Sequence, residues 1–174
     1  MAEIIKCYTQ KIPATRFIGK KYGDSDRVNG GFGNKWGEWF QNGWFESIES
    51  ACKTKTCETF KDSGAYIGLM RHKDGEPFQY WIGIFTPEGT EVPEGFEYRD
   101  FPASILGVCW VYGDETKGEV YMQEGRCSGK LMENGHAIQS DNGAYWFFER
   151  YTCPRFTTPD DKGNVILDIC FYIE

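Results

Sequence analysis

The chain contains an internal repeat, which constrains its fold more than any other feature. The segment IPATRFIGKKYGD at 12–24 is echoed by FPASILGVCWVYGD at 101–114, with one extra residue in the second copy. In the same way, GAYIGLMRH at 64–72 is echoed by GAYWFFERY at 143–151. A helix-like stretch lies between the members of each pair, and a strand-like segment follows each copy. The sequence therefore predicts two successive strand–helix–strand–strand modules.

Such a repeat favours an α+β fold in which the strands pair antiparallel and two helices pack on one face of the sheet. A chain of 174 residues suits one domain. We expect module one at about 1–86, a linker at 87–99 and module two at about 100–174. Two similar modules side by side leave a groove at their junction, and such grooves often bind ligands.

The individual elements follow from local patterns of residues. We expect strands at 6–9, 12–22, 64–71, 78–85, 101–114, 143–153 and 165–173, with a turn at 73–75 where Lys-Asp-Gly supplies turn residues. Apolar residues at three- and four-residue steps predict an amphipathic helix from Asn34 to about Ala51. A second helix is expected at about 115–134.

One carboxylate stands out in the strand GAYWFFERYTC at 143–153. Side chains alternate between the faces of a strand, so Tyr145, Phe147, Glu149 and Tyr151 share one face. The basic side chain of Arg150 points to the other face. An unpaired buried carboxylate is costly, so either a cation of the protein neutralises Glu149, or it awaits a positively charged ligand, or it is exposed at a sheet edge.

The repeat helps to decide between these alternatives. Aligning GAYIGLMRH with GAYWFFERY pairs Tyr66 with Tyr145, and Met70 with Glu149. Since one module has methionine where the other has glutamate, the fold does not require an acid at this position. We therefore expect a functional role for Glu149.

Composition narrows the class of ligand. The 13 Phe, 10 Tyr and 6 Trp make 29 aromatic residues, enough to line a pocket or to form an aromatic-rich core. A net charge of −7 disfavours nucleic acids and anionic membrane surfaces as partners. The negative net charge would weakly attract cationic ligands.

The seven cysteines are expected to be reduced thiols in a cytoplasmic protein. The first residues lack the apolar stretch of a signal peptide, and no apolar run approaches membrane-spanning length. Cys52 and Cys57 are separated by four residues without a nearby histidine, so we expect no metal site. No phosphate-loop or dinucleotide motif is present, and we expect no cofactor.

These features resemble the gyrase-inhibitor-like (GyrI-like) small-molecule-binding family, which also forms the effector-binding domain of multidrug-responsive regulators of the MerR and AraC classes. The resemblance rests on the tandem layout, on the PA-strand-G-D motif that opens each half, and on the FERY segment followed by a terminal strand ending in FYIE. It spans nearly the whole chain. No helix-turn-helix precedes the first strand, so we expect a stand-alone protein that does not bind DNA directly.

The resemblance implies an aromatic groove between the modules, with Glu149 at its base and its strand neighbours Tyr145, Phe147 and Tyr151 beside it. Module symmetry adds Tyr66, Trp81, Trp110 and Tyr112 as wall residues, each of which could instead belong to the core. Met70 is the counterpart of Glu149. The helical residues Trp36, Trp39 and Phe40 could form the floor of the groove, although such a stripe also suits packing.

Three functions remain open. The first is binding of aromatic, cationic or polarised ligands without turnover, because aromatic faces and a carboxylate both attract cations. The second, implied by stand-alone relatives, is hydrolysis of strained cyclopropane-type rings, with Glu149 as general base and a tyrosine (Tyr66, Tyr112 or Tyr145) stabilising the developing charge. The third is inhibition of a DNA-binding enzyme by protein–protein contact, for which the scattered acidic residues give weak support.

Overall fold

The structure is a computed structural model that describes residues 1–52 and 59–174. Its centre is an eight-stranded sheet with the order β1-β6-β8-β7-β3-β4-β2-β5, in which all neighbouring strands are antiparallel. The strands are β1 (Glu3–Ile12), β2 (Thr15–Tyr22), β3 (Tyr66–His72), β4 (Gln79–Pro87), β5 (Glu97–Phe101), β6 (Ser104–Gly113), β7 (Tyr145–Tyr151) and β8 (Val165–Ile173). The predicted α+β class with an antiparallel sheet is confirmed.

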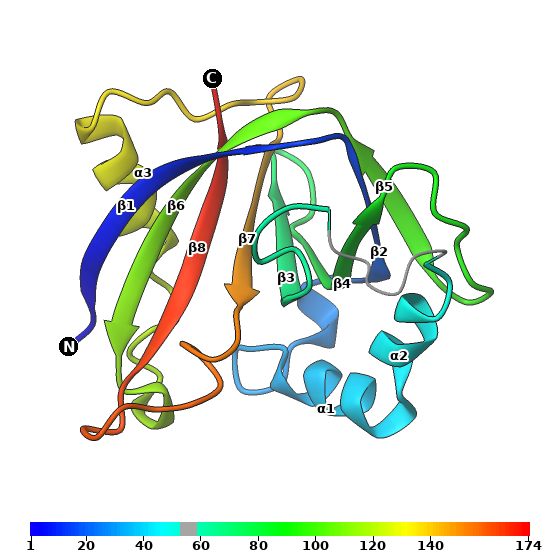
Figure 1. The fold of residues 1–174 in the computed structure, drawn as a ribbon, viewed down its shortest axis with the longest axis horizontal. Coiled ribbons are helices and arrows are strands. Elements are labelled where there is room, and N and C mark those ends of the chain that lie inside the picture. Colours follow the sequence, from blue (N-terminus) through cyan, green and yellow to red (C-terminus); the bar gives the residue numbers. More distant parts are fainter. Residues whose placement is uncertain (53–58) are drawn as a thin grey trace.

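The strand order is pseudo-symmetric. The counterparts in the two halves of the chain are β1 and β5, β2 and β6, β3 and β7, and β4 and β8. Exchanging the strands of each pair gives the same sheet order read from the other edge, so a pseudo-two-fold axis passes between β3 and β7. Leu69 and Phe148 pair directly at this axis. The edge strands are exchanged: β1 pairs with β6 of the second half, and β5, which begins inside the predicted linker, pairs with β2 of the first half (Figure 1).

The helices are shorter than the sequence predicts. The expected helix at 34–51 is two helices, α1 (Gly33–Asn42) and α2 (Trp44–Glu49), because Gly43 adopts a left-handed conformation with φ 64°. The expected helix at 115–134 is reduced to a 3₁₀ turn (Glu115–Lys117) and α3 (Glu124–Glu133). Left-handed conformations at Gly118 and Met122 interrupt the segment between them.

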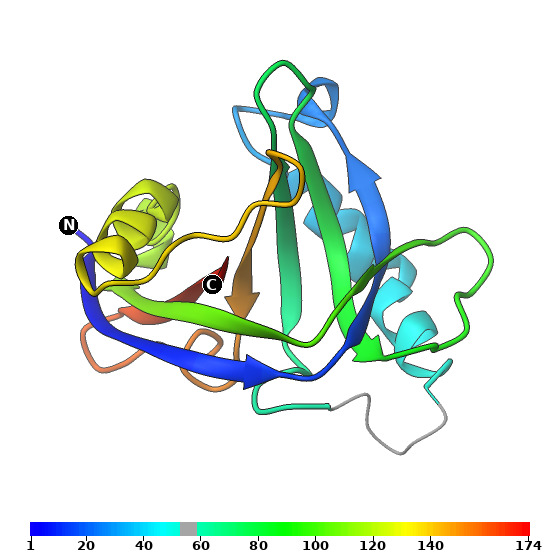
Figure 2. The same cartoon turned by 90° about the horizontal axis from the view of Figure 1, so that it is seen from above.

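Both helical regions pack on one face of the sheet and leave its centre between them. Helix α3 covers apolar residues of β6 and β8, such as Val111 and Leu167, while α1 and α2 cover residues of β2 and β4, such as Ile18 and Ile82 (Figure 1). The opposite face carries a separate core, which includes Phe85 and Phe148, where β1–β2 and β5–β6 bend across the molecule (Figure 2).

The cysteines differ in part from the expectation. Cys52 is disulfide-bonded, so the prediction of reduced thiols is wrong for this residue, and Cys57 lies outside the described residues. The other five cysteines (Cys7, Cys109, Cys127, Cys153 and Cys170) are free. No helix in the described ranges is long and apolar enough to cross a membrane.

Candidate functional site

A cavity of about 1250 Å³ lies on the helical face of the sheet, over the central strands β3 and β7. Helix α1 and the loop before it form one wall, and segments around 115–124 and 153–165 form the other. Its aromatic lining residues come from both halves: Phe32, Trp36, Phe40, Tyr66, Phe78, Tyr80, Tyr121, Phe147, Tyr151 and Phe156. The central strands of the sheet therefore carry an aromatic cavity large enough for a drug-sized molecule.

Glu149 on β7 is one of the lining residues of this cavity, and 7% of its surface is exposed. Tyr151 donates a hydrogen bond from its hydroxyl to Glu149 Oε2 at 2.7 Å, and Tyr80 on β4 donates to the same oxygen at 3.3 Å. None of the ion pairs within residues 1–52 and 59–174 includes Glu149. The carboxylate is thus held by neutral donors.

The direction of the Tyr80 bond is fixed by its other partner. Trp36 on α1 donates from its indole Nε1 to the Tyr80 hydroxyl at 3.0 Å. Because an indole N–H can only donate, the Tyr80 oxygen accepts this bond and its own proton is free to point to Glu149. A chain of donors therefore runs from the helix to the carboxylate.

Gly68 on β3 makes room for this arrangement. It pairs directly with Glu149 across the two central strands. A Cβ atom at position 68 would lie 2.5 Å from the Tyr80 hydroxyl and 3.1 Å from Glu149 Oε2. The absence of a side chain at Gly68 is thus a condition for the tyrosine–glutamate contact.

Burial is the main influence on the protonation of Glu149. Desolvation raises the pKa of Glu149 from 4.5 to about 7, and the negative charge of Glu124 adds to the rise. The hydrogen bonds from Tyr151 and Tyr80 oppose it. Burial also raises the pKa of both tyrosines above the usual range. The tyrosines therefore remain protonated donors, while Glu149 titrates near neutral pH.

The remaining charged residues of the lining are mostly acidic. Glu49, Glu115 and Glu124 line the cavity, and the Tyr121 hydroxyl donates to Glu115 Oε1 at 2.8 Å. The lining also includes Arg27, which forms an ion pair with Asp24 at 2.8 Å. The electrostatic potential of this lining favours a cation over an anion.

The structure brings most of the predicted strand residues together. Tyr66, Met70, Phe147, Glu149 and Tyr151 all line the cavity. The alternation predicted for β7 explains this, since Phe147, Glu149 and Tyr151 project from one face of the strand. Of the helical candidates, Trp36 and Phe40 also line the cavity.

Five other predicted residues do not line this cavity. Tyr145, at the start of β7, is 41% exposed, and Trp39 is fully buried in the core, where its Nε1 donates to the Tyr22 hydroxyl. Trp81 and Trp110 lie with the core on the opposite face of the sheet. Tyr112 donates to Asp160 at 2.7 Å, outside the lining.

Sequence reasoning missed the aromatic lining residues Phe32, Phe78, Tyr80, Tyr121 and Phe156. Tyr80 could have been found, because it alternates with Trp81 in the predicted strand at 78–85 and so must occupy the face that Trp81 does not. Tyr121 and Phe156 lie in irregular segments, where the sequence carries no periodic signal. Their positions depend on how the loops fold back over β7.

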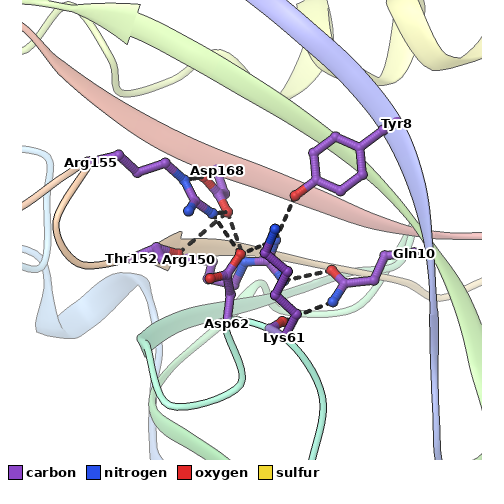
Figure 3. Close-up of polar contacts among 8 residues, drawn as sticks. All are labelled: Tyr8, Gln10, Lys61, Asp62, Arg150, Thr152, Arg155 and Asp168. Carbon is purple, nitrogen blue, oxygen red and sulfur yellow. Dashed lines mark hydrogen bonds and ion pairs between the residues drawn. The ribbon is translucent and has the colours of Figure 1, made fainter.

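Arg150 does not neutralise Glu149, as strand alternation predicts. On the opposite face, its Nε donates to Asp168 Oδ2 at 2.8 Å and its Nη1 to Gln10 at 3.0 Å (Figure 3). Arg155 donates to both carboxylate oxygens of Asp168 and to Asp62. The two arginines and two aspartates balance in charge, so this buried cluster is complete without Glu149.

Comparison with known proteins identifies similar folds. No family model matches the chain, and no curated protein matches it in sequence. Among solved structures, SAV2435 bound to tetraphenylphosphonium has a TM-score of 0.66 at 13% identity, covering 98% of this chain and 94% of that one. The EcmrR C-terminal domain has a TM-score of 0.58 at 14% identity, covering 97% of each chain. A hydrolase from Listeria innocua has a TM-score of 0.52 at 7% identity, covering 97% and 92%. At these identities, the similarity establishes the fold.

Proposed function

We propose that this chain is a small-molecule-binding protein that takes up aromatic cations in the cavity over β3 and β7. The observation that carries the proposal is a buried carboxylate, Glu149, in the lining of an aromatic cavity, where tyrosine hydroxyls and no ion pair from the described residues hold it. SAV2435, which has the same fold, binds tetraphenylphosphonium, an aromatic cation.

Two interactions would bind such a cation. Each aromatic face of the lining contributes about 0.5–2 kcal/mol toward a cation placed over it. A carboxylate about 4 Å from the cation adds roughly 4 kcal/mol at an effective dielectric constant of 20, before the cost of desolvation is subtracted. Because stacking on rings accepts many flat or globular aromatic molecules, we expect broad specificity for shape and a requirement for positive charge.

The test is titration of the protein with tetraphenylphosphonium, followed by calorimetry and by the intrinsic fluorescence of the six tryptophans, of which Trp36 lines the cavity. We expect binding to wild type, binding weakened at least tenfold in Glu149→Gln, and much weaker binding of the neutral analogue triphenylphosphine oxide. Glu133→Gln, at an exposed position of α3 where Glu133 pairs with Lys130 at 3.2 Å, removes the same charge away from the cavity and should bind like wild type. Equal affinity of wild type and Glu149→Gln would refute the role of the carboxylate.

The pH dependence of binding gives a second readout. Below pH 7 the carboxyl of Glu149 becomes protonated and loses its charge. Affinity for tetraphenylphosphonium should therefore fall as the pH drops through about 7 and level off above it, and Glu149→Gln should lack this dependence. When a cation binds at neutral pH, the fraction of Glu149 that is still protonated should lose its proton. Calorimetry in buffers of different ionisation enthalpy measures this release, which should be less than one proton per protein.

A second candidate function is hydrolysis of strained-ring electrophiles. It is favoured by the pKa of Glu149, since a general base works best with a pKa near the working pH. In this reaction Glu149 would accept a proton from water as the water oxygen attacks the ring carbon and the strained C–C bond breaks. Tyr66, which lines the cavity and is not one of the donors to Glu149, would donate a hydrogen bond to the oxygen that gains charge. Product formation from a cyclopropane-type alkylating compound, lost in Glu149→Gln, would favour this function over binding alone.

A further inference from the structure

Three of the free cysteines meet at the edge of the sheet, away from the cavity. Cys7 on β1 and Cys109 on β6 are directly paired in the antiparallel ladder, and their sulfur atoms are 3.1 Å apart. Cys109 also lies against Cys127 of α3, whose backbone carbonyl is 3.7 Å from the Cys109 sulfur. In the described part of the chain, no group of cysteine, histidine and acidic residues is arranged to hold a metal.

A β-bulge sets the orientation of Cys7. The register of β1 against β6 shifts between Ile4 and Lys6, so one extra residue is inserted into β1. The shift places Ile4 and Cys7 on the same face, toward α3, whereas strict alternation would place them on opposite faces. Without the bulge, Cys7 would face away from Cys109.

We propose that Cys7 and Cys109 are a redox-active pair that forms a disulfide across β1 and β6. Directly opposite residues in an antiparallel pair have Cα atoms about 4.5–5.5 Å apart, within the range of about 4.4–6.8 Å found for disulfides. The sulfur atoms need to approach by only about 1 Å to reach the bonded distance of about 2.05 Å. Small side-chain rotations are thus sufficient.

The accessibility of the two thiols suggests the order of events with a peroxide as oxidant. Cys7 is partly exposed and Cys109 is buried. The sulfur of Cys7 attacks hydrogen peroxide, the O–O bond breaks and water leaves, which gives a sulfenic acid. The sulfur of Cys109 then attacks the Cys7 sulfur, the S–O bond breaks and a second water leaves with the Cys109 proton. Two thiols are oxidised and one peroxide is reduced.

The disulfide would have a specific structural consequence. Edge strand β1 belongs to the first half of the chain but pairs with β6 of the second half. A covalent bond between residues 102 positions apart would therefore tie the two halves together. Burial raises the pKa of the Cys7 thiol to about 12, so the thiolate is scarce at neutral pH and oxidation should be slow without a sustained oxidant.

The sequence permits a direct assay. Trypsin cleavage after Lys6 and Lys11 releases CYTQK, and cleavage after Arg99 and Lys117 releases 100–117, so each peptide contains a single cysteine. The folded protein is treated with hydrogen peroxide at mildly alkaline pH, the remaining thiols are alkylated, and the peptides are analysed by mass spectrometry. We expect one linked species, two hydrogen atoms lighter than the sum of its peptides, that disappears after reduction with dithiothreitol.

Two variants and hydrogen exchange distinguish a specific Cys7–Cys109 disulfide from the effects of misfolding. Cys7→Ser should lose the linked species and retain a free Cys109, while Cys153→Ser, at an exposed cysteine, should form it as wild type does. Hydrogen exchange of the β1 amides should slow on oxidation of wild type and stay unchanged in Cys7→Ser. Recovery of both peptides only in alkylated form, or the same mixture of cross-links from native and urea-denatured protein, would overturn the proposal.

Discussion

Replacing Glu149 with glutamine should stabilise the protein in a pH-dependent way. The pKa of the buried carboxyl rises from 4.5 to about 7, and each pKa unit corresponds to about 1.4 kcal/mol, so ionised Glu149 destabilises the fold by about 3 kcal/mol. The folded state binds the proton more tightly than the unfolded state. Stability due to this group is therefore highest at low pH and falls as the pH rises from about 4.5 to about 7.

Urea unfolding of wild type and Glu149→Gln at pH 5 and pH 8 measures this effect. At pH 8 the variant should be more stable by up to about 3 kcal/mol, and at pH 5 the difference should shrink below about 1 kcal/mol. The exposed control Glu133→Gln should show no such difference. A Glu149→Gln variant that is equally or less stable than wild type at pH 8 would refute the conclusion that Glu149 is ionised and desolvated at a cost to the fold.

Two further substitutions test the surroundings of Glu149. Gly68→Ala places a Cβ atom 2.5 Å from the Tyr80 hydroxyl, so it should cost about 1–3 kcal/mol in urea unfolding and weaken tetraphenylphosphonium binding. Gly129→Ala in α3 should do neither, because outside the adjacent backbone of its own helix no atom lies within 4 Å of the added Cβ. Asp168→Asn removes the carboxylate that pairs with both Arg150 and Arg155 and leaves the two arginines with Asp62, so it should lower the stability by about 3–5 kcal/mol. The ligand affinity of the folded protein should stay unchanged, because the cluster lies on the opposite face of the sheet. Unchanged stability of Asp168→Asn would contradict the assignment of a structural role to this ion pair.

The parts of the fold that could be predicted are those fixed by local patterns. The predicted strand at 165–173 coincides with β8, and the turn at 73–75 connects β3 to β4 as expected. Alternation along β7 correctly separated Glu149 from Arg150, because the two-residue period of a strand determines which side chains share a face. These features need no information about distant contacts.

The misplaced residues depend on information that the repeat does not contain. Symmetry between modules selected Trp81 for the cavity wall, but the register of β4 against β3 pairs Tyr80 with Met70 and turns Trp81 to the other face. The rotation of α1 about its axis decides that Trp36 lines the cavity and Trp39 enters the core. The pairing of the edge strands β1 with β6 and β5 with β2 likewise joins residues far apart in sequence, and a local pattern does not predict such a pairing.

The candidate site arises from a break in the internal symmetry on both central strands. The cross-strand pair Met70–Phe147 and the pair Gly68–Glu149 are related by the pseudo-two-fold axis at Leu69–Phe148. In the first pair both side chains are large and apolar, whereas the second combines a residue without a side chain and a carboxylate. Gly68 alone would leave a void, and Glu149 alone would meet a side chain where Tyr80 now donates its hydrogen bond. Gly68 and Glu149 therefore depend on each other. The symmetry-related pair Met70–Phe147 packs without an acid, so packing alone does not require a glutamate at position 149.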